Sequence, residues 1–382
     1  MYQSSETSKQ AKTRSLSTKA TLACALVTAA FLAACGGGGG GSTTKTTTTT
    51  TPPPAVVNKA LWIANGTNVV EYIPSQLTPG ASAAVPHVMN NSGSFGAPQG
   101  VTFDAAGNQW VIDGGTVIAG GTVAPGLRKF TPAQQAALGT MKTPVPDVSI
   151  SSAAFKFPQQ AVFDPAGNLW VSDNGANAVY VFTPAQLAAT SGNVMPSITI
   201  TSTPAFNGPL GIVFDANGNL FVANNGSTTI FEFLAAKLPK TPGTVSLTPD
   251  VTLSDNGKGS IQAPWALVFD AMGNLWSSNA NPPNTVVEFG KANLVASGAP
   301  TPAVTLSPTT VNGNTTLSAP NGICFDNLGD LAAISANTPF GVPVFSHGQL
   351  ATSGATVPST LFVGPATTLN APAGCNFGPV VN

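Results

Sequence analysis

A nine-residue pattern that begins with Phe-Asp and has Gly at its fifth position recurs five times in this chain of 382 residues. The copies read FDAAGNQWV at 103–111, FDPAGNLWV at 163–171, FDANGNLFV at 214–222, FDAMGNLWS at 269–277 and FDNLGDLAA at 325–333. Successive copies begin 51 to 60 residues apart. This spacing restricts the chain to architectures built from similar units, each packed against its neighbours.

Residues 208–253 illustrate one unit. An apolar run at 211–214 precedes a turn at 215–219, and strand patterns follow at 220–223, 229–233 and 250–253. Asp215 can cap backbone N–H groups of the turn, and Gly218 can adopt the positive φ of a tight hairpin. Four strands per unit at this period predict an all-β fold, a β-propeller of four-stranded blades. The equivalent Asp residues of the other copies are therefore interpreted as turn caps.

A second repeat lies between the third and fourth strands of each unit. It reads YIPSQL at 72–77, FTPAQQ at 130–135, FTPAQL at 182–187, FLAAKL at 233–238, FGKANL at 289–294 and FSHGQL at 345–350. Thr183 suits a helix N-cap and Pro184 the first helical position, so a single helical turn is predicted there.

The chain starts in the middle of a unit. Residues 61–65 match a second strand, whereas 371–377 match the inner strand at 97–103. We therefore expect one blade to combine a C-terminal inner strand with three N-terminal strands, which hides free sheet edges. Counting this shared blade once predicts six blades.

One position of the repeat holds a large aromatic residue, which we expect to pack between neighbouring blades. Ala332 takes this position in the unit at 319–363, so we expect that blade to be the loosest. The aromatic residues are Trp62, Trp110, Trp170, Phe221 and Trp276.

The units resemble NHL-repeat propellers, which combine a Pro-x-Gly-Ile strand, an Asp-x-x-Gly-Asn turn and a second strand with an aromatic residue. The resemblance covers about residues 58–382 and implies the propeller architecture. It does not imply one activity, because that superfamily includes lactonases, lyases and binding modules.

The first 34 residues have the pattern of an export leader. A basic start precedes an apolar stretch at 21–34 that is too short to span a bilayer. Leu32-Ala33-Ala34-Cys35 is similar to the lipobox of bacterial lipoproteins, which implies lipidation of Cys35 and, with Gly36 next, an outer-membrane location. An ordinary secretory cleavage near Ala34 is the alternative. Residues 35–57, rich in Gly, Thr and Pro, are predicted to be a tether, and 58–382 the propeller.

Charge limits the class of partner. The leader holds four of the 14 Lys and Arg residues and one of the 15 Asp and Glu residues, so the remainder has a net charge of −4. Because no basic stripe is present, nucleic-acid binding is disfavoured. We expect a monomer with a protein, peptide or glycan ligand.

Cys324 and Cys375 fall on predicted inner strands of the two blades that meet where the ring closes. An oxidising compartment permits a disulfide. Adjacent inner strands can also lie farther apart than the ~4.4–6.8 Å that a disulfide allows between Cα atoms. A disulfide and two buried free thiols both remain open.

Candidate binding residues are those that differ between the repeats. We expect the residue after the Pro of each inner strand at the mouth of the central channel: Gln99, Gln159, Leu210, Trp265, Asn321 and Ala373. Loops between second and third strands reach the same end and begin with Asn65, Asp113, Asp173, Asn224, Asn279 and Ser335. Such oxygen ligands suit a hard cation such as Ca²⁺, but capping of their own hairpins is the favoured interpretation. His87 and His347 are expected to be exposed polar residues.

The segment Pro320-Asn321-Gly322 is similar to one in the gluconolactonase and regucalcin family, where the Asn binds a catalytic divalent metal. Only Asn321 carries over, with Asp173 as a further weak metal candidate. The streptogramin-lyase type of propeller needs a His and a Glu in its site, and the two His residues of this chain are misplaced for it. A non-enzymatic binding or scaffolding module is therefore the first interpretation, and a metal-dependent lactonase or related hydrolase is the second.

Overall fold

A computed structural model describes residues 59–78, 85–118, 121–139, 143–188 and 191–381. All of them belong to one compact unit, Ala55–Asn382. The predicted leader, Cys35 and the tether lie outside the described residues. Within the described residues, no helix combines the length and apolarity needed to cross a bilayer.

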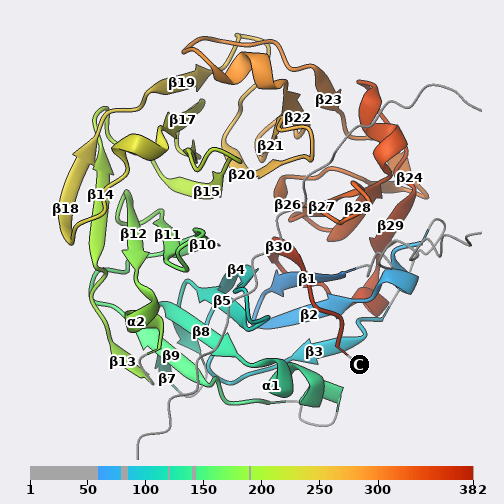
Figure 1. Ribbon diagram of the computed structural model, residues 1–382. Coiled ribbons are helices and arrows are strands. Elements are labelled where there is room, and N and C mark those ends of the chain that lie inside the picture. The colour runs from blue at the N-terminus through green and yellow to red at the C-terminus, as the bar shows by residue number, and fades with distance from the viewer. Residues whose placement is uncertain (1–58, 79–84, 119–120, 140–142, 189–190, 382) are drawn as a thin grey trace, which may run out of the picture. The chain divides into compact units, whose positions relative to one another are not determined.

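Six antiparallel sheets surround a central axis, as predicted, and Figure 1 looks along this axis. From the axis outward, blade one contains β30 (Pro372–Gly378), β1 (Ala60–Asn65), β2 (Asn68–Tyr72) and β3 (Val88–Asn90), and blade two contains β4 (Pro98–Phe103), β5 (Gln109–Asp113), β8 (Gly126–Phe130) and β9 (Val148–Ser151). Blade three contains β10 (Pro158–Phe163), β11 (Leu169–Asp173), β12 (Ala178–Phe182) and β14 (Ile198–Ser202), and blade four β15 (Pro209–Phe214), β16 (Leu220–Asn224), β17 (Thr229–Phe233) and β19 (Val251–Ser254). Blade five contains β20 (Pro264–Phe269), β21 (Leu275–Asn279), β22 (Val286–Phe289) and β23 (Val304–Leu306), and blade six β26 (Pro320–Phe325), β27 (Leu331–Ser335), β28 (Gly341–Phe345) and β29 (Thr360–Val363).

Short elements lie outside these strands. The hairpins are β6 (Thr116–Ile118) with β7 (Gly121–Val123), and β24 (Thr310–Val311) with β25 (Asn314–Thr315). Helical turns follow the third strands as α1 (Pro132–Ala136) and α2 (Pro184–Leu187), and as 3₁₀ turns at Pro74–Gln76, Ala137–Gly139, Ala235–Lys237, Lys291–Leu294 and His347–Ala351; a further 3₁₀ turn is Pro365–Thr367. Thr183 caps α2 by accepting the Gln186 N–H, which confirms the predicted cap.

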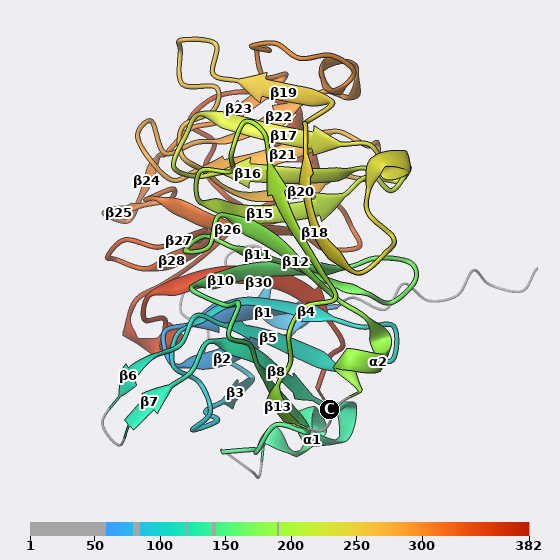
Figure 2. The same cartoon turned by 90° about the vertical axis from the view of Figure 1, so that its left-hand side faces the viewer.

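The number of strands per blade differs from the prediction in two blades. β13 (Ser191–Asn193) pairs in parallel with β9 of blade two, and β18 (Gly243–Leu247) pairs in parallel with β14 of blade three. Figures 1 and 2 show β18 at the rim beside β14. Both added strands belong to the connection that enters the fourth strand of the following blade. Blades two and three therefore carry a fifth strand beside the predicted four, because these connections pair with a neighbour's outer edge instead of looping freely.

The Asp residues that follow the inner strands cap their turns, as predicted. Asp164 Oδ1 accepts the N–H groups of Ala166 and Asn168, both at 2.9 Å. Gly167 has φ +81°, the left-handed conformation that favours glycine. The same pattern of acceptors recurs at Asp104, Asp215, Asp270 and Asp326.

In blades one to five, the aromatic residue of the second strand packs on the Phe that ends the next blade's inner strand. Trp170 meets Phe214 edge to face with 5.3 Å between ring centroids. Equivalent pairs join Trp62 to Phe103, Trp110 to Phe163, Phe221 to Phe269, and Trp276 to Phe325. Packing between blades by the second-strand aromatic residues is thereby confirmed, and all five of their rings are buried.

The ring closes as predicted, through β30. This C-terminal strand pairs antiparallel with β1, and Leu61 lies opposite Phe377. Cys324 and Cys375 form a disulfide with their Cα atoms 6.0 Å apart, which decides between the two alternatives left open by the sequence. The disulfide joins the inner strands of blades six and one, β26 and β30.

Candidate functional site

The central channel is narrow along the inner strands. Its cavity of about 140 Å³ is lined by residues of all six inner strands, including both disulfide cysteines. Glycines allow this close approach: a Cβ added to Gly374 would lie 2.6 Å from the Gln99 carbonyl oxygen, and one on Gly100 would lie 2.8 Å from that of Gln159. The backbones of adjacent inner strands therefore pack directly against each other.

Three of the six residues predicted at the channel mouth pack in the apolar core. Leu210, Trp265 and Ala373 belong to one buried apolar cluster. Gln159 is also buried, whereas Gln99 and Asn321 are half-buried. The Gln99 amide donates to the carbonyl of Ala97. A ligand-binding role for these six residues stays a prediction.

The Asn and Asp residues of the neighbouring loops are buried and hold the segment that leads into the inner strand. Asp173 accepts the backbone N–H groups of Lys156, Phe157 and Ala176 at 2.8 to 2.9 Å. Asp113 accepts those of Gly96, Ala97 and Gly115. Asn65, Asn224 and Asn279 accept the backbone N–H groups of Asn370, Asn207 and Gln262 respectively.

These interactions define a local structural role for the loop residues. Their oxygens satisfy backbone donors that would otherwise be buried without partners, which is costly. Across the described residues, no group of three or more His, Cys, Asp and Glu side chains is arranged to hold a metal ion. The proposed Ca²⁺ ligation by Asp173 and Asn321 stays a prediction.

The opposite end of the propeller carries a more varied surface. We call it the turn end, because the Asp turns and the helical turns meet there; the Ala235 N–H, for example, donates to Asn219 Oδ1. Grooves open at this end between blades two and three, three and four, four and five, and five and six. Each is walled by the interblade aromatic residue and by the Phe that ends the next inner strand.

One wall position changes from groove to groove. It belongs to the third strand and lies directly opposite the interblade aromatic residue in the cross-strand register. The six pairs are Trp62 with Glu71, Trp110 with Lys129, Trp170 with Val181, Phe221 with Glu232, Trp276 with Glu288, and Ala332 with Val344. The grooves therefore share a frame but differ in charge.

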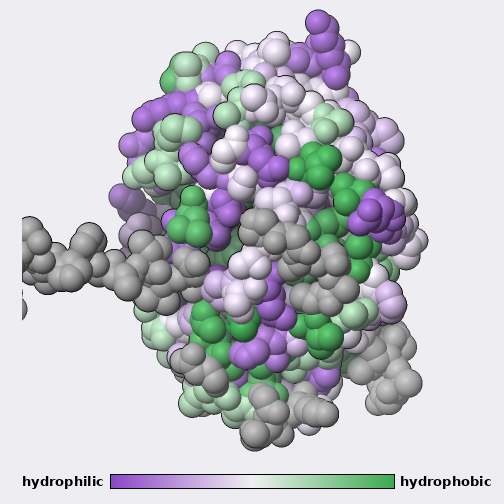
Figure 3. Space-filling model, turned by 90° about the vertical axis from the view of Figure 1, so that its right-hand side faces the viewer, coloured by the Kyte–Doolittle hydropathy of each residue, from purple (hydrophilic) through white to green (hydrophobic). Residues whose placement is uncertain are grey.

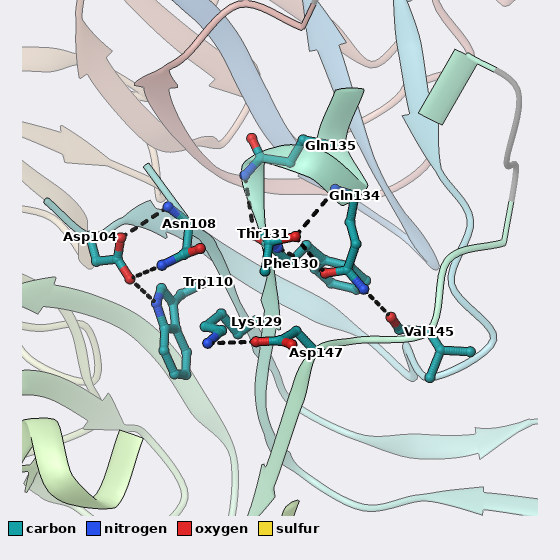
Figure 4. A network of polar contacts seen from close by, with 10 residues as sticks. All are labelled: Asp104, Asn108, Trp110, Lys129, Phe130, Thr131, Gln134, Gln135, Val145 and Asp147. Carbon is teal, nitrogen blue, oxygen red and sulfur yellow. Dashed lines mark hydrogen bonds and ion pairs between the residues drawn. The ribbon is translucent and has the colours of Figure 1, made fainter. Parts of the chain in front are cut away.

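Figure 4 shows the wall in blade two. Lys129 forms an ion pair with Asp147 at 2.6 Å, and its ammonium group lies 6.0 Å from the centre of the Trp110 ring. The Trp110 indole N–H donates to Asp104 at 3.0 Å. In the same view, the Gln134 amide donates to the carbonyl of Val145. The basic side chain of this groove is thus already paired.

Blade four has a buried acid at the same position. Glu232 is 5% exposed, and its Oε2 is buried without a hydrogen-bond partner. Burial, together with the charges of Asp215 and Asp250, raises the pKa of Glu232 to about 7. Phe221 offers no indole N–H to the adjacent Asp215, which keeps only the type of Asn amide donor, here from Asn219, that the turn Asp residues of blades two, three and five also have. Acidic groups therefore concentrate in this groove of about 630 Å³.

Blade five combines an acid with apolar walls. Glu288 is 9% exposed, and burial, with the charge of Asp270, raises its pKa. Trp276, Phe325 and Leu350 line the same groove, which has a volume of about 400 Å³.

Two large apolar residues stand at the rim of this groove. Met272 and Leu328 are 67% and 53% exposed. Figure 3 shows that apolar and polar side chains are interspersed on the side of the molecule that it faces. These exposed apolar side chains make the rim of this groove a candidate contact surface.

The groove between blades one and two is filled by the chain itself. Beyond β30, the Trp62 indole N–H donates to the Pro379 carbonyl at 3.0 Å, and the Val381 N–H donates to Glu71 at 2.8 Å. The other Glu71 oxygen lies 2.9 Å from His87 Nδ1. Burial raises the pKa of Glu71, and the bonds from His87 and Val381 oppose this shift. His87 is exposed, as predicted, but it is a partner of this buried acid.

The sequence analysis missed the wall position. Aligning the third strands by their final aromatic residue places Glu71, Lys129, Val181, Glu232, Glu288 and Val344 in one column. This column varies in charge, whereas the aromatic residue beside it does not vary in character. This contrast is visible in the sequence and would have indicated the turn end as a candidate binding surface.

The fold and grooves define the molecule as a six-bladed β-propeller. The chain matches no family model and no curated protein. It is similar to the structure of a putative 6-phosphogluconolactonase from Bacteroides fragilis, at 14% identity over 86% of this chain and 99% of that one, with a TM-score of 0.50. A protein of unknown function from Bacteroides caccae gives 10% identity over 80% and 98%, with a TM-score of 0.48. A streptogramin B lyase structure gives 16% over 78% and 79%, with a TM-score of 0.39. At these identities the similarity concerns the fold.

Proposed function

We propose that this protein is a non-enzymatic binding module of the bacterial cell envelope, with its recognition surface at the turn end. The observation that carries the proposal is the repeated groove, whose frame is constant while the residue opposite the aromatic ring changes from Lys to Val to Glu. A constant frame with one variable position suits selective binding of a protein, peptide or glycan. The rigid blades hold that position without reorganisation on binding.

A metal-dependent lactonase with its site at the channel mouth is the alternative. It would need carboxylate oxygens free to bind a metal. Asp113 and Asp173 each accept three backbone N–H groups, so recruiting them would release buried donors. Their present contacts favour the binding module.

The experiment compares binding and turnover in the full-length protein. Labelled protein is applied to peptide and glycan arrays, and we expect selective binding that Leu328→Asp or Met272→Asp weakens. Val145→Asp, a change at a 76% exposed residue outside these grooves, is the control. Equal binding by all variants would contradict a recognition surface at the turn end. Divalent-metal-dependent hydrolysis of a lactone panel, lost in Asn321→Ala, would establish the alternative.

Membrane attachment is the second part of the proposal and rests on the lipobox-like sequence before Cys35. The acyl chains would supply the membrane affinity. Cys35→Ser should move the protein from the detergent phase to the aqueous phase in a partitioning assay. Unchanged partitioning of this variant would exclude lipidation of Cys35 as the anchor.

A further inference from the structure

The groove between blades five and six is the counterpart of the groove that the C-terminal segment fills. Trp276 lies opposite Glu288 in the register of blade five, as Trp62 lies opposite Glu71 in blade one. Among the six blades, only these two combine Trp with Glu at this pair of positions. The chain thus contains the same pair of Trp and Glu in two grooves. The C-terminal segment occupies the groove between blades one and two.

The occupant of the first groove shows how such a wall binds a peptide. Val381 is 5% exposed and belongs to the apolar cluster of Trp62, Val88 and Phe130. Its backbone N–H donates to the Glu71 carboxylate at 2.8 Å. Besides the bond from Trp62 to Pro379, the C-terminal segment is therefore held by a hydrogen bond to a carboxylate and by insertion of an aliphatic side chain.

The second groove offers the same two elements. Within the described part of the chain, no hydrogen-bond donor is paired with the Glu288 carboxylate, although only 9% of this residue's surface is exposed. Phe325 and Leu350 supply apolar walls, and the exposed Met272 and Leu328 stand at the rim. A volume of about 400 Å³ lies within the range of small ligand sites.

One difference limits what can bind. Asp270 accepts the Trp276 indole N–H at 3.2 Å and so replaces the Pro379 carbonyl of blade one. The turn 270–273 therefore occupies the place of the first residue of the C-terminal segment. A partner segment in this groove therefore needs no counterpart of the Pro379 carbonyl.

We propose that the groove between blades five and six binds a short, extended, apolar segment of a partner protein, which donates one backbone N–H to Glu288 and inserts an aliphatic side chain against Leu350. The inference rests on the proposed function, because it names the ligand class of one groove at the turn end. Asp270, Asp326 and His347 are the other titratable groups that line this groove.

The probe is a fluorescent peptide with the sequence of residues 376–381, Asn-Phe-Gly-Pro-Val-Val, titrated into the full-length protein and followed by anisotropy. We expect saturable binding that Glu288→Gln weakens about tenfold, since a hydrogen bond to a charged acceptor is lost. N-methylation of the last Val removes the donor and should weaken binding by a similar factor. Because both changes break the same bond, the N-methyl peptide should lose little further affinity on Glu288→Gln.

Glu232→Gln is the matched control, since Glu232 occupies the same register position one groove away. This variant should leave the peptide affinity unchanged, and the Trp276 indole N–H signal in NMR should shift on binding. Weakening by Glu232→Gln instead of Glu288→Gln would overturn the assignment of the groove. Absence of saturable peptide binding would overturn this inference even if the arrays reveal a glycan ligand. Absence of any binding by the wild-type protein on the peptide and glycan arrays would instead contradict the proposed function.

Discussion

Val381 donates its backbone N–H to the carboxylate of Glu71, 310 residues earlier in the chain, at 2.8 Å. The contact lies just beyond β30, which supplies the inner strand of blade one. Closure of the ring therefore has two parts: pairing of a complete strand with β1, and burial of a short segment that follows it. The two parts are separable by truncation.

Truncation should destabilise the propeller in two steps. Removal of residues 379–382 eliminates the contacts of Pro379 with Trp62 and of Val381 with Glu71 but keeps β30, so we expect a lower melting temperature and retained cooperativity. Removal of 372–382 also eliminates β30 and exposes the edge of β1, so we expect loss of the cooperative transition. Circular dichroism melting of both variants checks this. Melting of the longer deletion at the wild-type temperature would show that β30 does not close the ring.

The disulfide between Cys324 and Cys375 should stabilise the seam. It links residues 51 positions apart, and cross-links of this kind contribute about 2–4 kcal/mol. We expect the wild-type protein to unfold at lower urea concentration when reduced. The Cys324→Ser/Cys375→Ser variant serves as the control, because reductant should not change its midpoint. Identical midpoints for oxidised and reduced wild-type protein would contradict the prediction.

Trp170→Ala should remove about 3–5 kcal/mol of stability, because it empties the space between blades three and four where the ring packs on Phe214. It also removes the indole donor to Asp164. Trp170→Phe keeps most of the ring volume and should cost less. Urea denaturation gives both values, and equal costs would show that the hydrogen bond, not packing, dominates.

The blade at 319–363 should be the least protected in hydrogen exchange. Ala332 replaces the interblade aromatic residue there, so this blade lacks the ring that the other five place against the next inner strand. Fewer apolar contacts lower the free energy of local opening. Mass spectrometry of deuterium uptake checks the order of protection. Slowest exchange in β27 and β28 would contradict the expectation.

Stability should fall as pH rises from about 5 to 7, in part because of Glu232. Its pKa is raised to about 7 in the folded protein, so the folded state binds more protons than the unfolded state in this interval. This contribution is complete below the ordinary glutamate pKa and is lost as pH rises through the folded value.

The Glu232→Gln variant tests this linkage. The variant should show a smaller decrease in melting temperature between pH 5 and 7 than the wild type. Glu71, Glu288 and Asp326, whose pKa values are also raised, should leave a residual slope of the same sign. Parallel pH profiles for the variant and the wild type would exclude Glu232 as a source of the dependence.

The sequence by itself determined the repeated features of this protein. Six blades, the Asp-capped turns, the helical turn after Thr183 and the aromatic packing each depend on a pattern that recurs within one unit. Closure by the last strand was also predictable, because residues 371–377 repeat the inner-strand pattern of 97–103. Local hydrogen bonding and strand alternation suffice for these features.

Tertiary structure alone decided what occurs between units. The sequence left the disulfide open, because the distance between neighbouring inner strands depends on how closely their backbones pack at Gly100 and Gly374. It could not show that Asp173 binds the N–H groups of Lys156 and Phe157, or that β18 pairs with β14. Nor could it place Val381 against Glu71. Such contacts join segments far apart in the chain, and only the closed ring of blades brings them together.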